Sequence, residues 1–522
     1  MTPAVDPSAR GRRILALALP TLSIDRVRRR EALSGGAPDE RPLAIVERAG
    51  GLLRLVAVDA RAAASGCVAG TALTQARSVC PELRVEPADP REDAALLGAV
   101  ADWCDRYTPL VALDPPSGLT LDISGCAHFF GGEAALAEDL VAGLQRQGIA
   151  ARAAVASAAG PARALAWFSQ GGVAPPDGEA ALVSGLPIAA LGLDESARLG
   201  LVRAGLKTVG AVAGRSRSEL AARFGARLVA ILDDALGRTE APISPRRPVP
   251  VRLVEQRFAE PLSSAEAALA VLRALAGALA ARLEAAGEGV RAAEAAFFRA
   301  DGKVARIALG VGAPTRDPDL LLRLFRERLD ALADPLDPGF GFDLMRLSAL
   351  AVEPLTPRPQ GFDPGERQEG ELAELIDRLS ARHGRRRVLR FLPGDAHRPE
   401  AEAALRPAQD VREAVAWPER PTGEPPRRPL RMFSRPEPVD VLAEVPDGPP
   451  LRFVWRRATH HVVRAEGPER IALEWWRHDE APLTRDYFRV EDSAGARFWL
   501  FRDGLFGREV RHPRWFVHGL FA

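Results

Sequence analysis

Lysine is almost absent from this chain: Lys207 and Lys303 are its only lysines, and arginine supplies nearly all of the positive charge. This bias is typical of a GC-rich coding sequence, although arginine also suits phosphate contacts. Lysine and arginine number 70 against 69 acidic residues, so the formal net charge is +1. A chain without a global excess of positive charge can bind nucleic acid only through local surfaces.

Cysteine is equally scarce, and its four positions lack both C-x-x-C spacing and a nearby pair of histidines: Cys67, Cys80, Cys104 and Cys126. We therefore expect no metal site and no cofactor. Scattered thiols in a chain of 522 residues suit a reducing compartment.

No apolar run approaches the ~18 residues that span a membrane. The apolar stretch 14–22 follows basic residues as in a signal peptide, but Pro20 interrupts it and no small-residue cleavage site follows. These features predict a cytoplasmic protein that does not enter a membrane.

The length of 522 residues predicts about three or four domains, and the texture of the sequence changes along the chain. Short strands mix with helices up to residue 178, and short helices punctuated by glycine follow from Gly185. Residues 248–355 predict a long helix capped by Ser263 or Ser264, a hairpin turning at Asp301-Gly302, and a second helix. Proline and charge dominate 357–429 around one predicted helix. Residues 430–522 are rich in strand formers and aromatic residues.

Three stretches in this order resemble motifs of the Y-family translesion DNA polymerases: "VAVDARAAASGCVAGTALTQARSVCPEL", "GLTLDISGC" and "LPIAALGLDESARLGLVRAGLKTVGAVA". They look like the fingers motif, the second palm strand and the thumb motif of that family. The resemblance implies a multidomain α+β fold with the architecture of these polymerases. Its expected parts are a palm (1–32 and 95–178), inserted fingers (33–94), a helix-hairpin-helix thumb (179–245), a little finger (246–356), a Pro-rich linker with a helix (357–429) and a C-terminal β-rich partner-binding module (430–522).

The carboxylates that define catalysis in this family are missing at the matching positions. Nucleotidyl transfer needs acidic ligands that hold two Mg²⁺ ions about 4 Å apart. The aspartate that ends the first palm strand falls on Ala18, within "LALALPTLSIDRVRRR". The Asp-Glu pair of the later strand falls on Ser117 and Gly118. The resemblance therefore predicts a palm without its metal chemistry.

The expected nucleotide contacts are missing as well. The family's triphosphate-binding Tyr and Arg fall on Ala60 and Ala63, its palm lysine falls near Gln170, and its ribonucleotide-excluding aromatic falls near Ser23. The alternative is an active translesion polymerase whose metal ligands have moved. Its candidate ligands are the nearby acids Asp25, Asp114 and Asp122.

The thumb-like stretch contains "AGLKTVG", in which the backbone of a helix-hairpin-helix element would contact DNA phosphates without reading sequence. The candidate DNA-binding residues are Gly205, Lys207, Thr208 and Gly210. Residues 246–330 carry 14 basic against 11 acidic side chains, a difference of 14 − 11 = 3. We expect modest, salt-sensitive DNA binding.

The closing region, with "RIALEWWR", "TRDYFRVED" and "WLFR", resembles the C-terminal module of a catalytically degenerate Y-family branch from bacterial mutagenesis cassettes. That resemblance implies a scaffold linking the β sliding clamp, an error-prone DnaE-type polymerase and a small RecA-like partner. Trp475 and Trp476 are candidate partner-binding residues. Adjacent residues of any strand point to opposite faces, so at least one of these rings should point outward, where it could contact a partner. Packing in a small β core and stacking on single-stranded DNA are the other readings of these tryptophans.

A clamp-binding peptide normally follows the little finger in this family. Gln360 and Phe362 in "PLTPRPQGFDPGE" are the candidate clamp contacts, although the leucine between them is missing and a linker without a function would look the same. The basic run Arg385-Arg386-Arg387 is the next candidate.

We expect a non-enzymatic scaffold of damage-induced mutagenesis. The alternatives are the active polymerase and a DNA-binding module without these partners.

Overall fold

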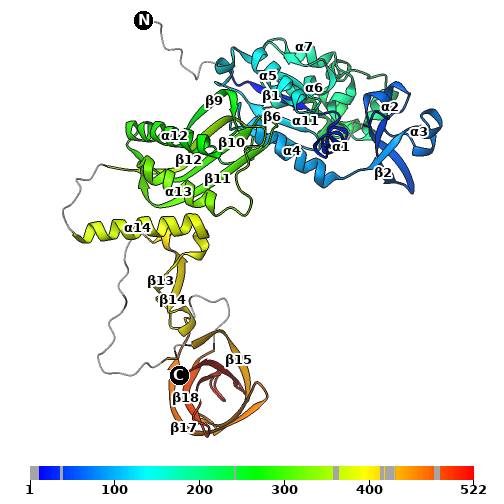
Figure 1. Cartoon of the computed structure of the whole chain (residues 1–522). Coiled ribbons are helices and arrows are strands. Elements are labelled where there is room, and N and C mark those ends of the chain that lie inside the picture. The colour runs from blue at the N-terminus through cyan, green and yellow to red at the C-terminus, as the bar shows by residue number, and fades with distance from the viewer. Residues whose placement is uncertain are drawn as a thin grey trace. The chain divides into compact units, whose positions relative to one another are not determined.

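The computed structural model describes residues 11–35, 39–239, 243–356, 364–411, 417, 428–429, 431–474, 476 and 483–521. Two compact units make up the chain, residues 1–360 and 361–522 (Figure 1). Within the described ranges, no helix is both long enough and apolar enough to cross a membrane. The first unit mixes helices and strands, and the second is rich in β-strands.

The palm sheet has five strands in the order β5-β6-β1-β7-β8. Its strands are β1 (Ile14–Ala18), β5 (Val111–Asp114), β6 (Gly118–Asp122), β7 (Arg152–Ala156) and β8 (Gly172–Val173). The helices in this part of the chain are α1 (Leu22–Leu33), α4 (Pro90–Cys104), α5 (Glu133–Arg146) and α6 (Ala159–Phe168). β1 is antiparallel to β6 and to β7, so it is the central strand.

β1 is buried on both of its faces. Ile14, Ala16 and Ala18 belong to one apolar cluster, which also contains residues of α6 and of the helices up to residue 236. Leu15, Leu17 and Leu19 belong to a second cluster, which contains residues of α4 and α5. Because side chains alternate along a strand, one apolar run supplies two cores.

A three-stranded sheet, in the order β3-β2-β4, lies between β1 and α4 in the sequence. Its elements are β2 (Leu43–Ala49), β3 (Leu52–Val58), α2 (Ala60–Ala64), α3 (Leu73–Val79) and β4 (Arg84–Pro87). Five short helices then follow the palm sheet: α7 (Glu179–Ser184), α8 (Glu195–Arg203), α9 (Val209–Ala213), α10 (Arg217–Phe224) and α11 (Ala226–Ala235).

The little-finger sheet has four strands in the order β11-β10-β12-β9. Its elements are β9 (Arg252–Leu262), α12 (Ala265–Ala285), β10 (Glu288–Arg299), β11 (Val304–Thr315), α13 (Pro318–Asp330) and β12 (Phe342–Pro354). The sequence predicted the hairpin and the two helices but not β9 or β12. Ser264 is the N-cap of α12, and its hydroxyl accepts a hydrogen bond from the N–H of Ala267 at 3.1 Å.

Two arginines, the half-buried Arg306 and the buried Arg346, join the little-finger sheet to the end of α4. Arg306 of β11 forms ion pairs with Asp105 and, at 2.8 Å, with Glu294. Arg346 of β12 donates a hydrogen bond to the backbone oxygen of Asp105 at 2.8 Å. The guanidinium groups of both arginines lie within 6 Å of the ring centroid of Phe298, at 5.8 and 5.6 Å. Burial raises the pKa of Asp105 to about 6 despite these arginines.

The second unit begins with α14 (Pro364–His383) and the two-stranded hairpin of β13 (Leu389–Pro393) and β14 (Ala403–Pro407). A closed barrel follows, with β15 (Arg431–Ala443), β16 (Pro450–Trp455), β17 (Ala458–Ile471), β18 (Arg485–Asp492), β19 (Arg497–Asp503) and β20 (Arg514–Leu520). The segment 357–429 was expected to be a linker with one helix, and it contains this hairpin in addition. Arg485 of the barrel donates to Glu400 at 2.9 Å, and Glu474 accepts from the N–H of His397 at 2.6 Å. These contacts attach the hairpin segment to the barrel.

Candidate functional site

The positions expected to match the metal-binding carboxylates lie side by side at one end of the palm sheet. Ala18, the last residue of β1, is directly paired with Gly118, the first residue of β6. The N–H of Leu19 donates to the backbone oxygen of Ser117 at 2.9 Å. The structure therefore brings the three positions together, and their side chains are a methyl group, a hydrogen atom and a hydroxyl.

Ala18 is buried as well as uncharged. Its exposed fraction is 0%, and it lies in the apolar cluster that also holds Ala154, Ala162 and Leu165. A carboxylate at this position would lose its water and gain no partner from these side chains. The strand end is therefore part of the hydrophobic core.

Gly118 is crowded by the strand next to it. A Cβ atom at this position would lie 3.0 Å from the backbone oxygen of Asp114 and 3.2 Å from a carboxylate oxygen of the same residue. An acidic side chain at 118 would therefore meet both a tight contact and a like charge.

The three acids considered as relocated ligands are each held by other groups. Asp114 forms an ion pair with Arg163 at 3.2 Å, and Asp122 forms one with Arg12 at 3.2 Å. The carboxylate of Asp25 accepts hydrogen bonds from the N–H of Ala150 at 2.9 Å and from the Thr21 hydroxyl at 3.1 Å. Burial raises the pKa of Asp25. In the part of the chain that the structure describes, no three His, Cys, Asp or Glu side chains gather as metal ligands, and the four cysteines are free.

The positions expected for triphosphate contacts lie on α2. Ala60 and Ala63 are both exposed and three residues apart, so they share one face of the helix. Gln170 is also exposed, after the end of α6, and Ser23 is half-buried in the first turn of α1.

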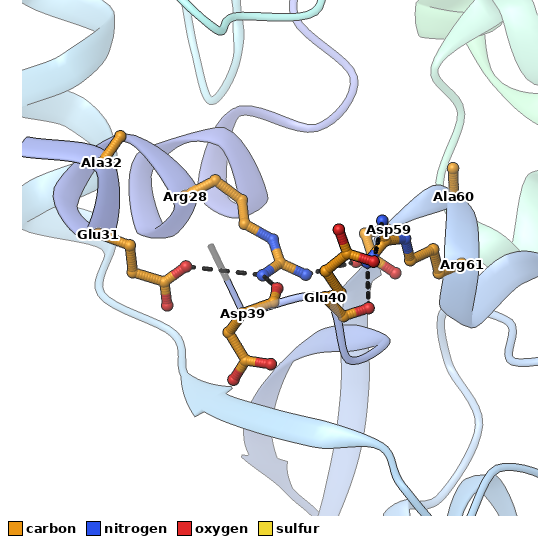
Figure 2. Close-up of a pocket in the computed structure, with 8 residues that line it drawn as sticks. All are labelled: Arg28, Glu31, Ala32, Asp39, Glu40, Asp59, Ala60 and Arg61. Atoms are coloured by element: carbon orange, nitrogen blue, oxygen red, sulfur yellow. Dashed lines mark hydrogen bonds and ion pairs between the residues drawn. The ribbon is translucent and has the colours of Figure 1, made fainter. Parts of the chain in front are cut away.

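A pocket of about 360 Å³ lies beside Ala60 and is lined mainly by charged side chains (Figure 2). Four carboxylates line it against two guanidinium groups: Glu31, Asp39, Glu40 and Asp59 against Arg28 and Arg61. Figure 2 shows Arg28 among these acids, and its ion pair with Asp59 is 2.9 Å long. Arg61 pairs with Glu40 at 3.4 Å. The Arg41 side chain holds the pKa of Asp39 well below its ordinary value. Arg84 pairs with Glu31 and Asp39, so the acids as well as both lining cations already have partners, and no guanidinium of the lining is left unpaired for a triphosphate.

The four candidate DNA-binding residues lie in or next to the turn between α8 and α9. Gly205 has a φ of +76° with open space around it, and Lys207 is exposed. Thr208 is the N-cap of α9 and accepts from the N–H of Ala211 at 3.2 Å. Gly210 has a packing role, because a Cβ there would lie 2.9 Å from the backbone oxygen of Ser184.

The clamp and partner candidates are placed only in part. Gln360, Phe362 and Trp475 lie outside the described residues. Trp476 is 59% exposed and lies edge-on to His397, with ring centroids 6.0 Å apart. It follows the end of β17, which stops at Ile471. Trp499 is fully buried in the barrel.

Sequence reasoning missed the basic side chains that surround these sites. Two examples are Arg163, which pairs with Asp114, and Arg28, which lines the pocket beside Ala60. Neither belongs to a recognisable sequence motif. Both are helical arginines in a chain with many arginines. Their partners come from distant segments, so only the fold reveals the pairing.

Two protein-family models match this chain, one in its N-terminal part and one in the little-finger region. Residues 35–166 match the impB/mucB/samB family, and residues 253–363 match the impB/mucB/samB family C-terminal domain. Among solved structures, a crystal structure of DinB from Sulfolobus solfataricus has a TM-score of 0.38 at 14% identity, covering 66% of this chain and 100% of that one. A post-insertion binary complex of Dbh DNA polymerase has a TM-score of 0.39 at 14% identity, covering 65% and 98%.

The family matches define a homologue of the Y-family DNA polymerases. Protein ImuB of Caulobacter vibrioides, from strains NA1000/CB15N and ATCC 19089/CB 15, is 42% identical over 468 residues. The alignment covers 88% of this chain and 100% of the relative in each case. The chain belongs to the ImuB family.

The importance of the apolar packing at Ala18 can be tested by placing a carboxylate there. We expect Ala18→Asp to lower the free energy of unfolding by about 3 kcal/mol at neutral pH, because a carboxylate at this fully buried position loses its water among apolar side chains. Burial would raise the folded-state pKa of the new Asp above its unfolded value. The loss should therefore be complete above that folded-state pKa and should shrink as the pH falls below it.

Urea unfolding followed by tryptophan fluorescence measures this effect. Ala63→Asp, on the exposed face of α2, is the matched control and should change the unfolding free energy by about 0.5 kcal/mol or less. Equal losses in the two variants, or losses independent of pH, would contradict the burial argument.

Proposed function

We propose that this protein is a non-catalytic Y-family scaffold in damage-induced translesion synthesis and mutagenesis. The observation that carries the proposal is the pairing of buried Ala18 with Gly118 at the strand ends where this family holds its catalytic metals. Membership of the ImuB family supports a role connected with DNA damage. The protein would act in the cytoplasm, at DNA or at replication forks after damage.

An active polymerase with relocated ligands remains the second candidate, and one observation favours it. Asp114 lies against Gly118, at the same end of the sheet as Ala18. Its carboxylate is paired with Arg163, and a single carboxylate cannot hold two Mg²⁺ ions in the geometry that nucleotidyl transfer needs. Beside Ala60, the lining cations Arg28 and Arg61 are already paired with Asp59 and Glu40, which also opposes triphosphate binding.

The proposed partners are the β sliding clamp, an error-prone DnaE-type polymerase and a RecA-like partner of the ImuA type. We assign clamp binding to Gln360 and Phe362, and partner binding to the C-terminal module with Trp475 and Trp476. The exposure of Trp476 supports an interface role, because tryptophan is enriched at the centres of protein interfaces. DNA binding through the turn 205–210 would be weak and independent of sequence.

The first test is nucleotide incorporation. Purified protein with a primed template and Mg²⁺ or Mn²⁺ should give no primer extension, because Ala18, Ser117 and Gly118 offer no carboxylates for two metal ions. Ala18→Asp or Gly118→Glu alone should not restore extension, since Ala60 and Ala63 leave the triphosphate without contacts. Extension by the unmodified chain that disappears in Asp114→Ala would establish the active polymerase instead.

The second test removes the C-terminal module. A chain ending at residue 429 should keep the first unit folded, because residues 1–360 form a compact unit of their own. It should lose binding to the polymerase and RecA-like partners in a pulldown with purified proteins. Trp476→Ala in the full chain is the matched point variant and should weaken the same binding with the barrel intact. Undiminished polymerase binding by the truncated chain would place that interface elsewhere.

The third test concerns the clamp. If Phe362 fills an apolar pocket of the clamp, Phe362→Ala should weaken clamp binding by about 2 kcal/mol, roughly thirtyfold. Phe391→Ala is the control, since Phe391 is an exposed phenylalanine of the second unit. Titration of the clamp measures both affinities. Equal affinities for the wild type and Phe362→Ala would direct attention to Arg385-Arg386-Arg387.

A further inference from the structure

Helix α14 exposes leucines and buries polar residues, the reverse of an ordinary surface helix. Leu372, Leu375 and Leu379 are 51%, 47% and 38% exposed. Asp377 and Ser380 of the same helix are buried, at 4% and 6%. The three leucines are spaced i, i+3 and i+7, so they form one continuous stripe along the helix. We call these three residues the leucine stripe.

The buried face of α14 fixes the orientation of the leucine stripe. Asp377 accepts a hydrogen bond of 2.7 Å from the side-chain amide of Gln409, which is itself buried. Turning the helix to bury the leucines would break this bond and leave the carboxylate of Asp377 without its partner. The leucine stripe is therefore held outward by a satisfied polar contact.

Charge is distributed unevenly along the helix beside the leucine stripe. The acids Glu369, Glu371 and Glu374 precede the basic residues Arg378, Arg382 and His383, and all of these side chains are exposed. At 100° per residue, Glu371, Arg378 and Arg382 share one edge of the stripe, and Glu369 and His383 share the other. An antiparallel copy of the helix would place basic residues opposite the acidic ones along both edges.

We propose that a second copy of this chain packs on the leucine stripe, with the two α14 helices antiparallel about a two-fold axis. Leu372 would then contact Leu379 of the second copy, and the two copies of Leu375 would meet near the axis. Glu371 would face Arg378 and Arg382 of the second copy. A two-fold interface must be self-complementary, and this stripe meets that condition in both its apolar residues and its charges.

The small size of the leucine stripe predicts a weak dimer. Three leucines from each copy bury much less surface than a standard interface, so a dissociation constant on the order of 10 µM is expected. The proposal concerns α14 alone, so it does not depend on the scaffold function.

Sedimentation equilibrium of the full chain from about 1 to 200 µM tests the dimer. The wild type should shift from the mass of one chain to that of two. Leu375→Glu should weaken dimerisation by about tenfold or more, because each dimer loses both copies of a buried leucine and gains two carboxylates. Leu442→Glu is the matched control, since Leu442 lies on β15 and is 57% exposed. It should dimerise like the wild type.

Charge reversal distinguishes an antiparallel pair of α14 helices from any other contact. One variant carries Glu369→Arg and Glu371→Arg, so basic side chains replace these acidic ones beside the leucine stripe. The other carries Arg378→Glu and Arg382→Glu, so acidic side chains replace these basic ones. Each variant alone should remain monomeric at concentrations where the wild type is dimeric, and an equimolar mixture should form a heterodimer.

Several outcomes would overturn the proposal. A wild type that stays monomeric throughout the concentration range excludes the dimer. Dimerisation that survives Leu375→Glu places the contact elsewhere on the chain. Reversed variants that fail to form a heterodimer, with helix content equal to the wild type by circular dichroism, exclude the antiparallel arrangement.

Discussion

The burial of β1 on both faces is the constraint on which the first unit depends. The strand joins two apolar clusters, one with α4 and α5 and the other with α6 and the helices that follow. A polymerase palm needs a carboxylate at the end of this strand, and a carboxylate needs water or a cation. In this chain the strand end belongs to the packed interior, so an aspartate at Ala18 would lose its water among the apolar side chains around it. Stability and catalysis make opposite demands on the same position.

Many of the chain's arginines form ion pairs and hydrogen bonds within the fold. Arg28 and Arg61 pair with acids beside α2, Arg163 pairs with Asp114, and Arg306 and Arg346 join the little-finger sheet to α4. These guanidinium groups bind acids and carbonyl oxygens of the chain itself. Arginine suits such sites because its planar fork makes several directed hydrogen bonds and stays charged when buried. The composition alone could not separate this use from phosphate binding.

Much of the fold could be predicted from the sequence, and the failures have physical causes. Alternating or continuous apolar runs marked β1, β6 and β7, and a serine cap with a leucine face marked α12. The strands β9 and β12 were missed because charged residues interrupt their apolar patterns, and long-range pairing stabilises them. The family resemblance located Ala18 and Gly118, but their burial and the acids around Ala60 depend on contacts between distant segments. Local pattern also could not show that β17 ends at Ile471, before Trp476.

The barrel is closed by its first and last strands, since β15 pairs with β20 from Arg431 opposite Leu520 to Val439 opposite Trp515. Because the barrel closes in this way, it cannot form until the chain includes all six strands. A ribosome must release β20 before β15 and β19 can both be fully paired. Until then the nascent module carries two open edges, which are templates for intermolecular strand pairing. A frameshift or stop codon at or just before Arg514 would remove β20 and leave the other five strands as an open, aggregation-prone sheet.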